Sequence, residues 1–152
     1  RLQYIKNTAH SLIPLMARKN LTFTVNCKPE SMMGWLDTDK MDKIIFSLLS
    51  NSAKYTPEGG SVTLNVITNN RYDRITIQVI DTGVGIPKEK QASVFERFVK
   101  LNDFVQGTGL GLSICQAIAD RCNGHIGVTS EGEEKGSTFW MWIPCKHSGG
   151  LV

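Results

Sequence analysis

The chain has 152 residues, of which 41% are hydrophobic and 20% are charged; this composition supports one domain with a packed core and excludes a disordered chain. Seventeen Lys and Arg against fourteen Asp and Glu leave a net charge of +3, and the basic residues form no run, which argues against a nucleic-acid-binding protein. No apolar run reaches the roughly 18 residues of a membrane-spanning helix, and no signal peptide opens the chain. We therefore expect a soluble, cytoplasmic domain without direct membrane contact, which can be part of something larger.

The first third of the chain predicts a helix, two strands and a second helix. Apolar residues recur at helical spacing over residues 1–19, where Pro14 is expected to kink the helix or to end it near Ile13. Residues 21–25 alternate like a strand, residues 34–36 suggest a very short one, and residues 37–39 supply a helix start. The helix that follows carries one apolar face, formed by Met41, Ile44, Ile45, Leu48 and Leu49 and completed by Ser52.

The rest of the chain predicts two pairs of strands around a glycine-rich segment and a helix. Turn residues 57–60 end the preceding helix, and the strands 62–66 and 75–79 form a hairpin pattern. A helix is expected from Leu110 to a cap at Asn123-Gly124. Two more strands, 125–130 and 137–144, precede a tail over residues 146–152.

These elements predict an α+β fold, a two-layer α/β sandwich with a mixed, mostly antiparallel sheet and helices on one face. Residues 82–111 fit no regular element except a helical turn at 94–98. A stretch of about 25 residues without regular structure inside a compact domain is usually a functional loop. We therefore expect the chemistry of the protein there.

The four cysteines, Cys27, Cys115, Cys122 and Cys145, predict neither a metal site nor a disulfide framework. They form no Cys-x-x-Cys pair, and no histidine lies at ligand spacing from them. Buried, reduced thiols in a reducing compartment are the better interpretation.

A polar row borders the apolar face of the second helix. Ser47, Asn51 and Lys54 share one edge of this face, and Tyr55 follows. The Asn51 carbonyl oxygen could ligate a hard cation such as Mg²⁺, and Lys54 could reach a phosphate. Taken alone, the same residues fit an ordinary solvated helix edge.

A second motif follows the strand 75–79. Alternation places Asp81 on the same face as the apolar residues of that strand, and Gly83 and Gly85 come directly after it. A carboxylate at the margin of the core needs a donor, for which the amino group of adenine would serve. In isolation, the motif equally fits an aspartate that caps its own turn.

A third motif, Gly107-x-Gly109-x-Gly111, opens the helix that begins at Leu110. Glycines at a helix N-terminus expose amides that bind anions. The motif is neither a Rossmann fingerprint, because no strand precedes it, nor a Walker A loop, because the Lys-Ser/Thr ending is missing.

The order and spacing of these motifs, together with Phe95-Glu-Arg-Phe98, is specific. Over residues 21–144 the chain resembles the ATP-binding catalytic (HATPase) domain of sensor histidine kinases, in the GHKL superfamily of gyrase, the large heat-shock chaperone and mismatch-repair ATPases. The motifs look like the N, G1, F and G2 boxes of that family. The resemblance implies a Bergerat-type fold with a long ATP lid.

The resemblance also implies ATP and Mg²⁺ as ligands and a role for each motif residue. Asn51 would ligate Mg²⁺, Lys54 would contact phosphate oxygens, and Tyr55 would line the adenine pocket. Asp81 would accept a hydrogen bond from the adenine amino group, while Gly83 and Gly85 let the loop pass the base.

Residues 87–106 would form the lid, which Phe95 and Phe98 would anchor to the domain. Arg97 or Lys100 would help to hold the γ-phosphate, with nothing in the sequence to choose between them. The other residues expected to bind ATP are Ile86, Gly107, Thr108, Gly109, Leu110, Gly111 and Leu112.

Ser47 departs from the family. Hydrolytic members carry Glu four residues before the Mg-binding Asn, and histidine kinases commonly carry Asn there; a serine cannot act as the base for water. A related GHKL-fold ATPase or protein kinase, or a non-catalytic nucleotide-sensing module, remains as an alternative to a histidine kinase.

The acceptor histidine is expected outside this chain. The phosphoacceptor of the family is followed by an acidic residue, whereas His10 is followed by Ser11. We interpret residues 1–19 as the end of a dimerisation helix with its linker, residues 20–145 as the catalytic domain and 146–152 as a tail. The implied partners are the dimerisation domain of the same kinase and a response regulator receiver domain.

Overall fold

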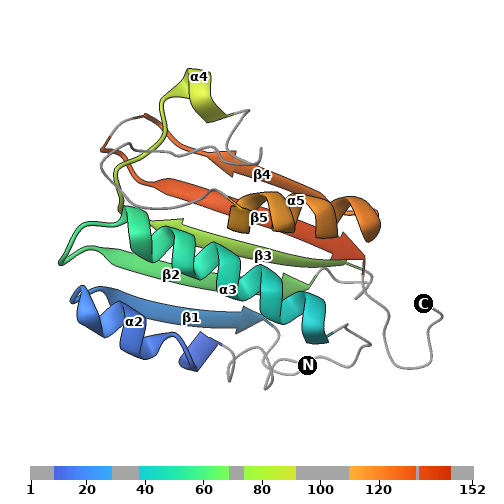
Figure 1. Cartoon of the computed structure of the whole chain (residues 1–152), viewed down its shortest axis with the longest axis horizontal. Coiled ribbons are helices and arrows are strands. Elements are labelled where there is room, and N and C mark those ends of the chain that lie inside the picture. Colours follow the sequence, from blue (N-terminus) through green and yellow to red (C-terminus); the bar gives the residue numbers. More distant parts are fainter. Residues whose placement is uncertain (1–8, 29–37, 69–73, 92–109, 133, 145–152) are drawn as a thin grey trace.

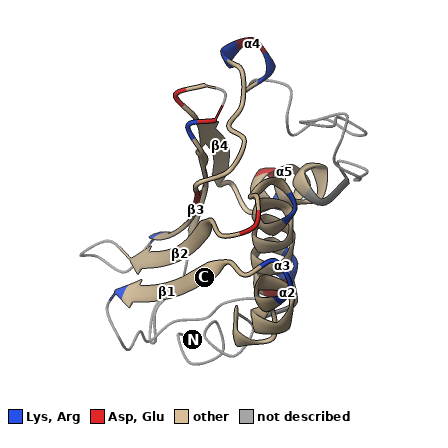
Figure 2. Ribbon diagram, turned by 90° about the vertical axis from the view of Figure 1, so that its left-hand side faces the viewer, with Lys and Arg blue, Asp and Glu red and all other residues tan. Residues whose placement is uncertain are grey.

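The computed structural model describes residues 9–28, 38–68, 74–91, 110–132 and 134–144. They form two layers (Figure 1), a five-stranded sheet with the order β1-β2-β3-β5-β4 and a layer of helices. Figure 2 shows α2 (Ile13–Arg18), α3 (Thr38–Tyr55) and α5 (Leu110–Arg121) on the same side of the sheet. The predicted two-layer α+β architecture is therefore confirmed.

The sheet is mixed, as predicted. β1 (Thr22–Lys28) runs parallel to β2 (Ser61–Thr68), and every other neighbouring pair is antiparallel: β2 with β3 (Arg74–Asp81), β3 with β5 (Ser137–Pro144), and β5 with β4 (His125–Thr129). Ile75, Ile77 and Val79 are fully buried, whereas the residues between them are not. This alternation is what allowed the hairpin of β2 and β3 to be predicted.

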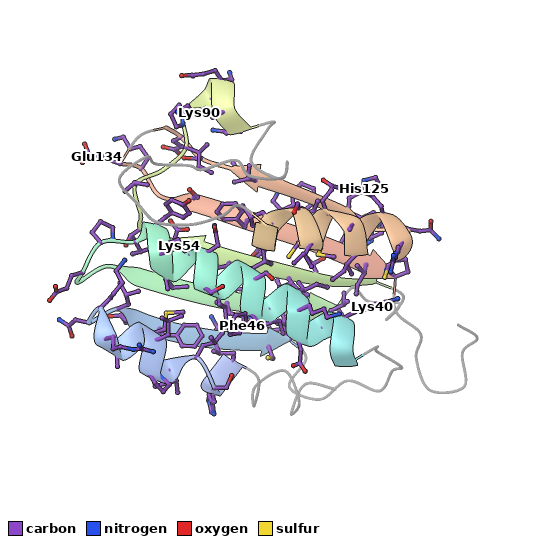
Figure 3. The ribbon with its side chains drawn as sticks, in the orientation of Figure 1. Lys40, Phe46, Lys54, Lys90, His125 and Glu134 are labelled. Atoms are coloured by element: carbon purple, nitrogen blue, oxygen red, sulfur yellow. The ribbon has the colours of Figure 1, made fainter. Side chains whose placement is uncertain are left out.

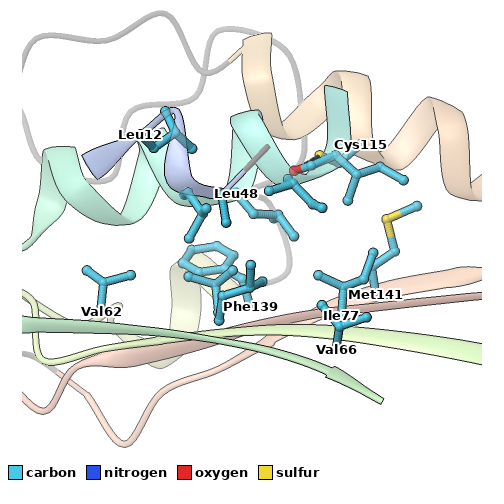
Figure 4. Close-up of a cluster of buried hydrophobic side chains, with 14 of the residues drawn as sticks. Leu12, Leu48, Val62, Val66, Ile77, Cys115, Phe139 and Met141 are labelled. Carbon is cyan, nitrogen blue, oxygen red and sulfur yellow. Dashed lines mark hydrogen bonds between the residues drawn. The ribbon is translucent and has the colours of Figure 1, made fainter. Parts of the chain in front are cut away.

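The core lies between the sheet and the helices (Figure 4). The face of α3 predicted from the sequence is buried: Met41, Ile44, Ile45, Leu48 and Leu49 are at most 1% exposed. From the sheet, Phe139 and Met141 of β5 and Ile77 of β3 meet this face, and Leu12 joins the same cluster. Burial of this face is the main reason why α3 is stable as a helix.

The carboxyl end of α3 is capped from outside the helix. Lys19 Nζ donates to the carbonyl oxygens of Ala53 (2.7 Å) and Lys54 (3.2 Å), and partial burial lowers the pKa of Lys19. A cation at this end satisfies carbonyls that the helix leaves free and complements the helix dipole. Lys19 thus fixes the segment that carries Lys54 and Tyr55.

The N-terminal segment differs from the sequence prediction in detail. Pro14 lies in the first turn of α2, which begins at Ile13 after a turn at residues 11–12, so the proline starts a helical segment where it was expected to kink or end one. Ala9, Leu12 and Met16 are buried in the core cluster of the domain. Residues 9–18 therefore pack with the residues that we assigned to the catalytic domain.

Several other expectations can be compared with the described residues. β1 extends three residues beyond the predicted strand, and α4 (Lys88–Gln91) lies where the sequence suggested no helix. Cys27 and Cys115 are buried and form no disulfide, as predicted, and burial raises the pKa of Cys115 to about 12; Cys122 is only half-buried. The short strand at 34–36, the helical turn at 94–98, the tail and Cys145 lie outside the described residues. No helix of the described part is both long and apolar enough to cross a membrane.

Candidate functional site

Asn51, Lys54 and Tyr55 near the end of α3 lie at the same end of the sandwich as Asp81, Gly83 and Gly85, where β3 ends. Figure 3 shows Lys54 at the end of α3 that lies toward Lys90 and Glu134, with Lys40 at the opposite end. The backbone joins these elements directly: Val84 N donates to the Tyr55 carbonyl at 3.0 Å. The loop after β3 is therefore attached to the last residue of α3.

Asp81 is the buried carboxylate of this region. It is 6% exposed at the end of β3, and its Oδ1 accepts hydrogen bonds from Gly83 N (2.9 Å) and Ser137 N (3.1 Å). The bond to Gly83 is the turn cap that the sequence suggested, so Asp81 caps its turn and also lies at the core margin. Both of these backbone donors bind Oδ1. The second carboxylate oxygen receives neither of these two bonds.

Burial raises the pKa of Asp81, and the hydrogen bonds of Gly83 and Ser137 counteract the increase. The Ser52 hydroxyl also lies near enough to lower this pKa. Its Oγ is nevertheless buried and has no partner of normal hydrogen-bond geometry among the described residues. The Asp81 carboxylate and the Ser52 hydroxyl are therefore two buried polar groups close to each other, and the hydrogen bonds of the hydroxyl are not fully satisfied.

The raised pKa makes a prediction about stability and pH. Because the pKa of Asp81 is higher in the folded chain than in the unfolded chain, the folded chain binds more protons. The free energy of unfolding therefore falls as the pH rises from about 4 through the folded pKa of Asp81. The Asp81→Asn variant has no carboxylate to ionise at this position, so we expect it to be more stable than the parent chain at pH 7. Urea unfolding across the pH range measures this difference, which should shrink toward pH 4; a difference that grows on acidification would contradict the burial argument.

The loop after β3 leaves no room for side chains at its two glycines. A Cβ on Gly83 would lie 2.5 Å from the Tyr55 carbonyl oxygen and 2.9 Å from Asp81 Oδ1. Gly85 has a φ of +72°, and a Cβ there would overlap the Gly132 carbonyl. The glycines thus permit close backbone approaches around Asp81, where the sequence predicted them to admit a ligand.

Gly85→Ala is therefore expected to cost more stability than a left-handed glycine in open space. Gly59 is the matched control, because its φ is +88° and no atom would lie within 4 Å of an added Cβ. Gly59→Ala should lose about 1–2 kcal/mol from backbone strain alone, and Gly85→Ala about 1–3 kcal/mol more from overpacking. Urea unfolding of both variants measures the two losses, and equal losses would contradict the close contact.

Asn51, Lys54 and Tyr55 occupy the last two turns of α3. Asn51 is half-buried, and its Nδ2 is buried without a hydrogen-bond partner among the described residues. An unsatisfied buried amide is typical of a position that a bound group completes, and its carbonyl oxygen is a suitable Mg²⁺ ligand. Lys54 is exposed, and Tyr55 is 7% exposed and part of the core cluster. The donor set fits a metal-bound phosphate beside Asn51 and Lys54.

Ser47 faces α5. The hydroxyl of Ser47 lies close enough to the Cys115 thiol to lower its pKa, against the larger effect of burial. Ser47 is half-buried at this contact between α3 and α5. A residue packed in this way contributes to the junction of the two helices, where a small side chain fits.

The remaining predicted residues divide into three groups. Ile86 and Leu112 are 1% and 3% exposed, so their side chains belong to the core. The backbones of Leu110 and Gly111 form the start of α5. The others lie outside the described residues: Phe95, Arg97, Phe98, Lys100, Gly107, Thr108 and Gly109.

Sequence reasoning missed Ser137 and did not assign a role to Ser52. Ser52 interrupts the apolar face of α3 with a hydroxyl, and this was a usable signal. Ser137 meets Asp81 only because β3 and β5 pair in the register Asp81↔Ser137, and no local pattern fixes that register. Ser130 and Gln91, which hold the loop after β3, were also missed; Ser130 and Ile86 lie 44 residues apart in the sequence.

A groove of about 370 Å³ lies at a different place, between α2 and β1. Its lining is apolar except for the exposed His10: Ile13, Met16, Ala17, Leu21, Phe23 and Val25 complete it. None of the predicted site residues lines this groove.

The comparisons with known proteins agree with the fold and the motifs. The family model of histidine kinase-, DNA gyrase B- and HSP90-like ATPases matches residues 36–147. The adaptive-response sensory kinase SasA of Synechococcus sp. (strain JA-3-3Ab) is 37% identical over 135 residues, which cover 88% of this chain and 35% of that protein.

Two solved structures have the same fold over nearly the whole chain. The catalytic domain of histidine kinase ThkA matches with a TM-score of 0.79 and 26% identity, covering 93% of this chain and 90% of that one. Full-length ShkA in complex with AMPPNP matches with a TM-score of 0.85 and 25% identity, covering 97% of this chain and 30% of that one. The chain thus spans about a third of the length of SasA and of ShkA. It belongs to the family of histidine kinase-, DNA gyrase B- and HSP90-like ATPases, and its fold is that of the ATP-binding catalytic domain of sensor histidine kinases.

Proposed function

We propose that this chain binds Mg²⁺-ATP and transfers the γ-phosphoryl group to a histidine on a separate dimerisation domain, as the catalytic domain of a two-component sensor histidine kinase. The observation that carries the proposal is the buried position of the Asp81 carboxylate and its hydrogen bonds. A buried carboxylate with one oxygen held by two backbone amides, beside a glycine without room for a side chain, suits recognition of an amino group on a flat base. The family and the similar fold of the AMPPNP-bound ShkA support the same ligand class.

Each part of the nucleotide has residues that suit it. Asp81 accepts a hydrogen bond from the adenine amino group, while Gly83, Gly85 and the buried Tyr55 and Ile86 shape the wall around the base. Lys54 attracts the phosphates, and Asn51 is the residue that would hold Mg²⁺, which neutralises phosphate charge when it is bound. From the motifs alone, we assign further contacts to Phe95, Arg97, Phe98, Lys100, Gly107, Thr108, Gly109, Leu110, Gly111 and Leu112.

The chain needs to supply no covalent chemistry. Phosphoryl transfer depends on positioning and on stabilisation of the phosphate charge. The imidazole nitrogen of the acceptor histidine forms its bond to the γ-phosphorus while the bond from that phosphorus to the ADP oxygen breaks. The phosphohistidine then donates its phosphoryl group to an aspartate of a response regulator. In agreement with such a partner, a solved ThkA structure is a complex with the response regulator protein TrrA.

We further propose that residues 1–19 are the end of the dimerisation helix with its linker, that residues 9–18 also contribute to the core, and that residues 146–152 form a tail. The domain would then act in the cytoplasm as part of a larger, membrane-anchored receptor. Residues 20–145 are proposed as the catalytic domain because the resemblance covers residues 21–144.

Transfer from labelled ATP tests the proposal. The chain is incubated with [γ-³²P]ATP, Mg²⁺ and the histidine-bearing hairpin domain of the same kinase. We expect label on the hairpin in an acid-labile, alkali-stable bond, as a phosphoramidate requires. Release of free phosphate without labelled hairpin would instead favour an ATPase, and nucleotide binding with neither product would favour a nucleotide-sensing module.

A further inference from the structure

The loop that contains Gly83 and Gly85 is held from the opposite side by the turn between β4 and β5, described by residues 130–132 and 134–136. Gly136 N donates to the Gly83 carbonyl at 3.2 Å, and Glu134 N donates to the Val84 carbonyl at 2.6 Å. The two segments lie about fifty residues apart in the sequence. The conformation of the loop after β3 therefore depends on a turn that itself contributes none of the residues assigned to the nucleotide.

Ser130 is the centre of this contact. Its Oγ donates to the Gly136 carbonyl at 2.7 Å and accepts from Ile86 N at 3.0 Å and from Gly132 N at 3.2 Å. One hydroxyl thus closes the β4–β5 turn and binds the loop after β3 to it. A side chain without this hydroxyl would leave the Ile86 amide without its partner.

Gln91 adds a second connection from α4. Its Nε2 donates to the carbonyl oxygens of Ile86 and Ser130, both at 3.0 Å. Ile86 is therefore held through its amide by Ser130 and through its carbonyl by Gln91. The Ile86 side chain is buried as well, so Ile86 fixes one end of the loop. Gly83 fixes the other end, because its amide donates to Asp81 Oδ1.

We infer that Ser130, assisted by Gln91, is a positioning residue for recognition of the base. The inference rests on the proposed function, because it concerns the loop that would pass the adenine ring. Ser130 itself does not contact the reacting atoms. It holds Ile86, and through the short segment 83–86 it keeps the backbone beside Asp81 in the geometry that distinguishes an amino group from a carbonyl oxygen.

Discrimination between ADP and GDP is the readout that separates positioning from stability. Adenine carries an amino group where guanine carries a carbonyl, so a correctly placed Asp81 favours ADP. A variant that merely unfolds a fraction of the chain lowers both affinities by the same factor and leaves their ratio unchanged. A variant that displaces the loop lowers the ratio.

The experiment measures ADP and GDP dissociation constants calorimetrically for the parent chain and four variants. For Ser130→Ala we expect the ADP constant to rise about tenfold and the ADP preference over GDP to fall by a similar factor. Gln91→Ala should show the same change to a smaller degree. Gln91 is the last residue of the short helix α4, so we expect this variant to fold and to test the inference even if Ser130→Ala does not fold. Ser130→Thr retains the hydroxyl and should restore the preference, and Thr129→Ala, an exposed neighbour in β4, should leave it unchanged.

Hydrogen exchange of the Ile86 amide, followed by NMR, gives a second measure, and it should become at least about tenfold faster in Ser130→Ala. An unchanged ADP preference in both Ser130→Ala and Gln91→Ala would overturn the inference while leaving the proposed function intact. Absence of ADP binding by the parent chain would overturn both.

Discussion

Asp81→Asn is expected to weaken ADP binding by about a hundredfold or more while the chain stays folded. Oδ1 is occupied by the amides of Gly83 and Ser137, so the substitution preserves that acceptor and converts the other oxygen into an NH₂ donor. A donor placed against the adenine amino group loses a charge-assisted hydrogen bond and leaves both groups unsatisfied, at a cost of about 3 kcal/mol or more. Titration calorimetry with ADP measures the loss.

Asp120→Asn is the matched control for this substitution. It makes the same chemical change on an exposed carboxylate of α5, which accepts from Gln116 Nε2 at 3.0 Å. ADP affinity should be unaffected there. If Asp81→Asn bound ADP as tightly as the parent chain, the assignment of Asp81 to the base would be wrong, even though the increase in stability predicted at pH 7 could still occur.

Asn51→Ala is expected to lower phosphotransfer to the hairpin domain by about a hundredfold or more, with little effect on ADP binding in the absence of Mg²⁺. The physical reason is that Asn51 supplies a neutral carbonyl ligand, whereas the base is recognised elsewhere, at Asp81. ADP titrations with Mg²⁺ and with EDTA, together with the labelled transfer assay, separate the two effects. In the variant, Mg²⁺ should no longer tighten binding as it does in the parent chain.

Asn26→Ala is the corresponding control. Asn26 lies on β1, and its side-chain amide donates to Asn65 Oδ1 on β2 at 3.1 Å, so it is an asparagine outside α3. Its Mg²⁺ dependence and transfer rate should equal those of the parent chain. Parent-like Mg²⁺ dependence in Asn51→Ala would rule out Asn51 as the metal ligand.

The sequence predicted the parts of the fold that depend on local periodicity. The apolar face of α3 and the alternation of β2 and β3 are both visible in the chain, and the alternation also placed Asp81 at the core margin correctly. Pro14 shows the limit of such reasoning, because a proline is compatible both with the end of one helix and with the first turn of the next. The four-residue α4 carries too little periodicity to be recognised.

The contacts that complete the candidate site could not be predicted in the same way. Ser137 reaches Asp81 through the register of β3 and β5, which are distant in sequence, and Ser130 reaches Ile86 from the turn between β4 and β5. Lys19 caps α3 over a separation of 34 residues. In each case one polar side chain or amide satisfies a group that only the tertiary fold brings near it, so the local sequence holds no sign of the partner.

An NMR titration of the 152-residue chain with ADP tests the central claim most directly. The claim predicts saturable shifts of the Gly83 and Ser137 amides, which both donate to Asp81 Oδ1. Shifts at Phe23 and Val25, which line the groove between α2 and β1, should be absent. Saturable shifts confined to that groove, or no shifts at all, would show that the carboxylate at the end of β3 does not recognise the base.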